Sequence, residues 1–128
     1  MVETSLTKEL IDAGANLVRE LDGRGLGPDA AFWLYFPDLQ AWKLVLVKVK
    51  VGEVGPRKVY REIQETLTGA PELKELKLDD VSISKPDAPI VALLRKVIHT
   101  GPGISDIRFK NNVINGTLIE DAYIYRLN

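Results

Sequence analysis

The chain has 128 residues, with 17 Lys and Arg against 18 Asp and Glu, and it contains no cysteine. This length is typical of one domain that buries a core without covalent crosslinks. The balanced charge provides no basic face for nucleic acid, and the absence of cysteine excludes disulfides, thiolate metal sites and thiol nucleophiles. Residues 1–10 are polar, and no apolar run approaches the roughly 20 residues that span a bilayer. We therefore expect a single cytoplasmic domain over residues 1–128, without a cofactor and without nucleic-acid or membrane partners.

A helix is predicted first, over residues 5–21, where apolar residues recur every three or four positions. The loop that follows, DGRGLGPD, contains the spacing G-x-G-x-G. Its glycines follow a helix and precede a strand, which is the reverse of a dinucleotide-binding loop. The pattern therefore favours a connector, and Arg24 is of interest only if the fold gathers other cations beside it.

Residues 30–51 form the segment around which we expect the fold to be organised. They contain both tryptophans, and their alternation predicts two antiparallel strands joined by a turn at 37–40. Every second residue of 45–51 is a valine, and we assign this uniform face to the core. The opposite face is aromatic and apolar, as an interface centre is, although a helix of the same chain would cover it equally well. The interface candidates on this face are Trp33, Tyr35, Trp42, Leu44 and Leu46.

A polar loop containing Gly55 and Pro56 leads into a second helix that ends near Leu67. Arg57 and Lys58 lie in its first turn, beside free backbone N–H groups that can bind an anion. Cations are unfavourable to the helix dipole there, by about 0.3–1 kcal/mol each, which hints at a use for them. We therefore take Gly55, Arg57 and Lys58 as anion-binding candidates, with an ordinary solvated helix start as the alternative.

A third strand is predicted within residues 73–84, followed by a third helix that begins near Pro89. The adjacent Asp79 and Asp80 are more typical of a turn than of a divalent-cation site, which would need further ligands. His99, the only histidine, is predicted to lie in the last turn of the third helix. A cation is favourable at that end of a helix without any catalytic role.

The C-terminal part of the chain is predicted to be β. We expect strands over 104–110, 113–115 and 117–127. Asn111-Asn112 is the predicted two-residue turn, and Asn115-Gly116 a second turn or a bulge.

These elements predict an α+β two-layer sandwich with about three helices and a mostly antiparallel sheet, in the order αββαβαββ. We expect a small non-catalytic interaction domain that self-associates through the aromatic sheet face in a homodimer, or binds another protein there. The alternative is a protein or enzyme that takes a small anionic substrate, with charge from Arg24, Arg57, Lys58 and His99. No known metal-binding or catalytic motif is present, so we name no catalytic residue and no metal ligand.

Overall fold

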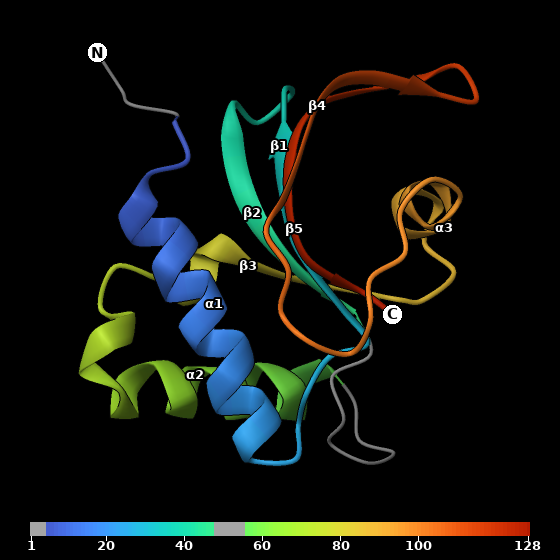
Figure 1. Cartoon of the computed structure of the whole chain (residues 1–128). Helices are drawn as coiled ribbons and strands as arrows, with labels where there is room; N and C mark the ends of the chain where they lie inside the picture. Colours follow the sequence, from blue (N-terminus) through green and yellow to red (C-terminus); the bar gives the residue numbers. More distant parts are fainter. Residues whose placement is uncertain (1–4, 48–55) are drawn as a thin grey trace.

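The computed structural model describes residues 5–47 and 56–128, which form three α-helices and one five-stranded sheet (Figure 1). The predicted α+β class, the mostly antiparallel sheet and the order αββαβαββ are confirmed. The elements are α1 (Lys8–Gly23), β1 (Ala30–Phe36), β2 (Ala41–Val47), α2 (Pro56–Gly69), β3 (Val81–Ser84), α3 (Pro89–Arg95), β4 (Ile107–Ile114) and β5 (Thr117–Leu127).

The strands lie in the order β3-β2-β1-β5-β4. β1 and β2 form the predicted hairpin, with Phe36 opposite Ala41 across the turn at 37–40. β5, the last strand in the chain, pairs antiparallel with both β1 and β4. β3 is the exception, because it lies parallel to β2 and is reached through α2, as a parallel connection requires.

One face of the sheet packs against α1 and α2, which form the helical layer of the predicted sandwich (Figure 1). Thr7 begins α1, and its Oγ1 accepts a hydrogen bond from the N–H of Leu10 at 3.2 Å. The apolar stripe of α1, which includes Leu17 and Leu21, is fully buried against the sheet. Burial of each such leucine stabilises the fold by about 1.5–3 kcal/mol, so this stripe holds α1 in place.

The opposite face of the sheet packs against the shorter α3. Val45 and Val47 are buried there, which confirms the predicted valine face for the part of it that is described. The remaining two valines of that face, at 49 and 51, lie outside the described residues. Val91 and Leu94 of α3 belong to the same apolar cluster, together with Ile114 and Ile119 from the end of the β4–β5 hairpin, which curls over α3 (Figure 1).

The turn between β4 and β5 is Asn115-Gly116, so the predicted turn at Asn111-Asn112 is wrong. Asn115 and Gly116 have φ angles of 50° and 79°, the two positive values of a type I′ turn. Glycine adopts the second of these angles without steric cost, whereas a second asparagine does not. Asn111 also has a positive φ, 51°, but it stays within β4.

Trp33 and Tyr125 are joined by a buried hydrogen bond, and a second hydrogen bond ties Tyr125 to α1. The indole Nε1–H of Trp33 donates to Tyr125 Oη at 2.9 Å, and Tyr125 Oη donates to the carbonyl of Ile11 at 2.5 Å. Burial raises the pKa of the Tyr125 hydroxyl, which therefore stays protonated as a donor. A Cβ atom on Gly14 would overlap both Tyr125 Oη and Trp33 Nε1, so the helix approaches this pair only because residue 14 has no side chain.

The glycine-rich loop between α1 and β1 is held to β5 by Arg126, whose side chain is 6% exposed. Its guanidinium binds both carboxylate oxygens of Asp22, at 3.0 and 2.7 Å. It also donates to the carbonyls of Pro28 and Gly103, at 2.9 and 3.2 Å. The loop is therefore a structural connector, as its position between a helix and a strand predicts.

Candidate functional site

Three of the five interface candidates are buried in the chain's own core. Trp33, Leu44 and Leu46 are at most 1% exposed and lie beneath α1 and α2. Helices of the same chain therefore cover the sheet face at these positions, which is the alternative to an open interface, because the apolar stripes of α1 and α2 pack there. Tyr35 and Trp42 are partly exposed, near the end of the sheet where α1 begins.

None of the anion-binding candidates that the structure describes lines the cleft at the end of the sheet. Gly55 lies outside the described residues, and Arg57 and Lys58 are exposed in the first turn of α2. Lys58 Nζ lies 3.3 Å from Glu62 Oε1 one turn later, so the charge of Lys58 is paired within the helix. Arg24 is exposed in the loop after α1. The prediction that His99 lies in the last turn of the third helix is wrong, because α3 ends at Arg95, and His99 is exposed beyond it.

No group of three or more His, Cys, Asp or Glu side chains that could hold a metal ion occurs within residues 5–47 and 56–128. Asp80 has a structural role instead, because its carboxylate accepts a hydrogen bond from the backbone N–H of Lys77 at 3.0 Å. The strand predicted within residues 73–84 is Val81–Ser84, and Leu78–Asp80 before it forms a 3₁₀ turn.

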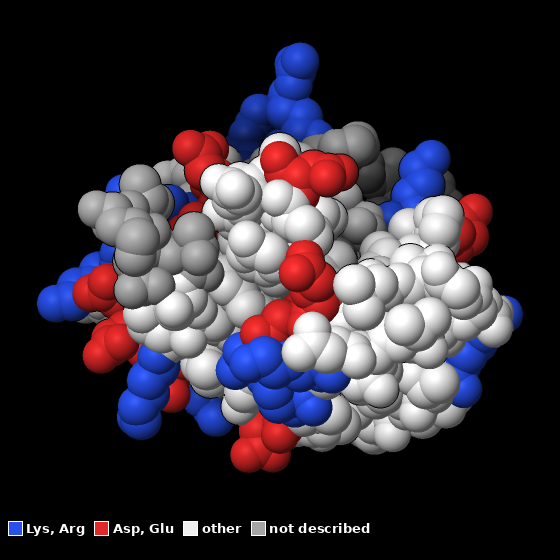
Figure 2. Space-filling model, turned by 90° about the horizontal axis from the view of Figure 1, so that it is seen from above, with Lys and Arg blue, Asp and Glu red and all other residues white. Residues whose placement is uncertain are grey.

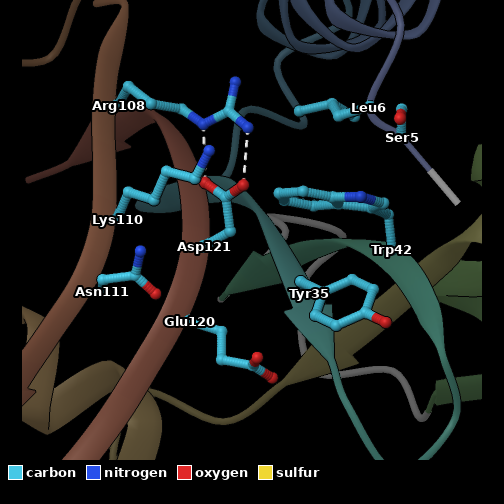
Figure 3. A pocket seen from close by; sticks show the side chains of 9 residues that line it. All are labelled: Ser5, Leu6, Tyr35, Trp42, Arg108, Lys110, Asn111, Glu120 and Asp121. Atoms are coloured by element: carbon cyan, nitrogen blue, oxygen red, sulfur yellow. Dashed lines mark hydrogen bonds and ion pairs between the residues drawn. The ribbon is translucent and has the colours of Figure 1, made fainter.

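A cleft of about 340 Å³ opens at the end of the sheet, beside the start of α1 (Figure 3). Aromatic side chains from β1 and β2 form one wall, and charged side chains from β4 and β5 form the other. The lining residues are Ser5, Leu6, Tyr35, Trp42, Arg108, Lys110, Asn111, Glu120 and Asp121.

Arg108 connects the two walls of this cleft. Its Nε and Nη2 atoms donate to the two carboxylate oxygens of Asp121, each at 2.6 Å. Its guanidinium carbon lies 5.6 Å from the ring centroid of Trp42, in a cation–π contact. Trp42 in turn meets Tyr35 edge-on, with the ring centroids 5.6 Å apart. We call Asp121, Arg108, Trp42 and Tyr35 the Arg–aromatic set.

The charge of Arg108 and its orientation are both fixed by this arrangement. Hydrogen bonding to Asp121 raises the pKa of Arg108 above its usual value, although solvent contact weakens the ion pair. Two parallel N–H···O bonds fix the plane of the guanidinium as well as its position. The Arg–aromatic set is therefore ordered before anything binds to it.

Exposed apolar side chains lie at the same end of the sheet. Leu39, in the β1–β2 turn, is 62% exposed, and the cross-strand pair Val113 and Leu118 is 66% and 57% exposed. Because β1 runs antiparallel to β5, the β1–β2 turn lies beside the Thr117 end of β5. Figure 2 looks onto this end and shows a band of charged side chains beside a broad uncharged area. We call this surface the open end, and it comprises Tyr35, Leu39, Trp42, Arg108, Lys110, Val113, Leu118, Glu120 and Asp121.

Sequence reasoning found Tyr35 and Trp42 but missed Arg108, Lys110, Glu120 and Asp121. The misplaced turn is the cause, because a hairpin closed at Asn115-Gly116 pairs Lys110 with Asp121. Arg108 then lies diagonally across from Asp121, within reach of a long side chain. The Asn-Gly dipeptide was the signal that could have predicted this ion pair.

The chain matches no protein-family model, and no curated protein or solved structure shows significant similarity to it. The geometry of the site is therefore the basis for the function proposed below. No helix among residues 5–47 and 56–128 combines the length and the apolar character needed to cross a bilayer.

Proposed function

We propose that the protein is a non-catalytic interaction domain that binds a protein partner through the open end of its sheet. The Arg–aromatic set is the observation that carries this proposal. Trp, Tyr and Arg are the side chains most enriched among residues that dominate binding energy at protein interfaces. A cytoplasmic location is part of the proposal.

The fixed positions of the side chains in the Arg–aromatic set favour binding. Each side chain that is immobilised on association costs about 0.5–1.5 kcal/mol. Arg108 is already held by Asp121 and Trp42, so less of this cost falls on the binding step. The exposed side chains of Leu39 and Leu118 supply apolar area beside it.

An anionic ligand in this cleft is a weaker interpretation. The volume, about 340 Å³, is at the lower end of the range for small-molecule pockets. Arg108 is already paired with a carboxylate, and Glu120 and Asp121 both line the cleft. Two carboxylates at the rim repel an incoming anion, so the charge distribution does not favour a small acid.

The proposal is tested by selecting random dodecapeptides displayed on phage against the folded protein, then measuring the affinities of synthetic copies by calorimetry. Trp42→Ala should weaken binding about 30-fold, the loss of one interface hot spot of about 2 kcal/mol. Leu118→Ser changes an exposed residue of the open end and should weaken binding without disturbing the fold. Val97→Ser is the matched control, because Val97 is 53% exposed and lies outside the open end.

The proposal is wrong if the selection yields no binding peptide. It is equally wrong if the selected peptides bind Trp42→Ala and Leu118→Ser as tightly as the unchanged protein. Circular dichroism of each variant separates loss of binding from loss of fold.

A further inference from the structure

The outer edge of β4 is the longest strand edge that the described sheet leaves without a strand partner. β4 has eight residues and pairs only with β5, at one margin of the sheet. β3, at the other margin, has four residues, and the N–H of Ile83 donates to Tyr60 Oη at 3.3 Å. Natural proteins blunt sheet edges by such shortness and covering, so the contrast singles out β4.

The hairpin turn fixes which backbone groups of β4 point away from the sheet. In a two-residue hairpin the residues flanking the turn, here Ile114 and Thr117, exchange hydrogen bonds. Residues of one strand whose side chains share a face direct their N–H and C=O groups to the same side. Ile107 and Phe109 share the α3 face with Ile114, so they also bond to β5, and the alternation shifts at Asn111, where φ is positive. Arg108 and Lys110, whose side chains line the cleft, therefore direct their N–H groups outward.

The side chains of β4 select the charge of anything that pairs with this edge. Its charged side chains are Arg108 and Lys110, both basic and both exposed on the cleft side. Arg108 is paired with Asp121, whereas Lys110 makes no ion pair with any residue that the structure describes. A strand laid beside β4 would place alternate side chains directly opposite these two, where carboxylates attract and cations repel.

We propose that an extended, acidic segment of a partner protein adds to the sheet along the outer edge of β4. Its backbone pairs with Arg108 and Lys110, its carboxylates lie beside the side chains of these two residues, and its apolar side chains reach the cleft at Trp42. The inference rests on the proposed function, since β4 forms one wall of the open end. Strand addition is an established mode of peptide recognition, in which backbone bonds give affinity and alternate side chains give specificity.

A second copy of the chain fits this edge less well. Antiparallel pairing of two β4 strands with Phe109 opposite Phe109 would set Arg108 of each copy opposite Lys110 of the other. Like charges directly opposite each other destabilise a strand pair. The edge therefore favours a different chain, one that carries acidic residues at alternate positions.

The probe is a blocked heptapeptide of alternating glutamate and valine, with the lysine-for-glutamate peptide and a backbone N-methylated acidic peptide as controls. Amide hydrogen exchange of the labelled protein is followed by NMR. Saturating acidic peptide should slow exchange at Arg108 and Lys110 by about tenfold or more, which is the mark of new backbone hydrogen bonds. Neither control peptide should do so.

Lys110→Pro removes an outward N–H and leaves the ladder to β5 intact, so it should bind the acidic peptide about tenfold more weakly than Lys110→Ala does. Lys110→Ala is the matched control, because it loses the same side chain and keeps the N–H. Protection of Arg108 in the unchanged protein decides the question if Lys110→Pro fails to fold.

Three results would overturn strand addition. Equal binding of the N-methylated peptide, with shifts at the Trp42 indole, would leave the proposed function standing and remove this mode of binding. Absence of any effect of the acidic peptide on β4 would also overturn it. So would protection of Arg108 that rises with protein concentration alone, because a second copy would then occupy the edge.

Discussion

The buried pair Trp33 and Tyr125 provides the sharpest test of the packing beneath α1. Tyr125→Phe removes one oxygen and keeps the ring, so it isolates the hydroxyl that accepts from Trp33 and donates to Ile11. Trp33 is 1% exposed, and its indole N–H would lose its acceptor without gaining water. The carbonyl of Ile11 is less affected, because it lies within α1.

A buried donor left without a partner costs about 1–3 kcal/mol. We expect Tyr125→Phe to lower the free energy of unfolding by about 2 kcal/mol, which for a chain of 128 residues shifts the melting temperature by about 7 °C. Urea denaturation followed by tryptophan fluorescence measures the free energy, and calorimetry measures the melting temperature.

A double-mutant cycle with Trp33→Phe separates the hydrogen bond from the other consequences of the substitution. In the Trp33→Phe background there is no indole donor, so Tyr125→Phe should cost at least about 1 kcal/mol less than it does alone. A cost below about 0.5 kcal/mol in the unchanged protein, or the same cost in both backgrounds, would refute the reasoning.

Three further predictions concern the same layer of the fold. Gly14→Ala should destabilise the protein by about 1–3 kcal/mol in urea, through overpacking, whereas Gly23→Ala, whose Cβ would meet no atom within 4 Å, should not. Asp22→Ala leaves the buried guanidinium of Arg126 without its carboxylate partner. Because Asp22 is 39% exposed, we expect the free energy of unfolding to fall by about 1–3 kcal/mol, less than for a fully buried pair. A measured loss below about 0.5 kcal/mol would contradict a stabilising role for this ion pair. Burial raises the pKa of Tyr125, so the folded state retains a proton that the unfolded state releases near pH 10; stability should therefore fall as pH rises above about 10, and less steeply in Tyr125→Phe.

The central hairpin could be predicted from the sequence because strand alternation is a local signal. Ala30–Phe36 and Ala41–Val47 pair as expected, and Val45 and Val47 are buried. What alternation could not decide is which chain covers the second apolar face. Trp33 and Leu44 look alike in the sequence whether a helix or another subunit lies over them, since only the tertiary packing of α1 and α2 distinguishes the two.

The candidate site was harder to predict because its members meet only through strand register. Arg108 contacts Trp42, 66 positions earlier in the numbering, across β5 and β1. Because the turn was predicted at Asn111-Asn112, every residue of β4 was assigned the wrong partner on β5, and the ion pair between Arg108 and Asp121 was not predicted. The turn chemistry of Asn115-Gly116 contained the information, because consecutive positive φ angles favour Asn-Gly over Asn-Asn.

The place of β5 in the sheet has a consequence for synthesis on the ribosome. β1 and β4 both precede β5 in the chain, yet β5 lies between them. A nascent chain that has emerged only as far as β4 therefore exposes one side of β1 with no strand to occupy it. Such unpaired edges favour aggregation, and pairings between distant segments form slowly. We expect this chain to need protection by chaperones until residues 117–127 have emerged.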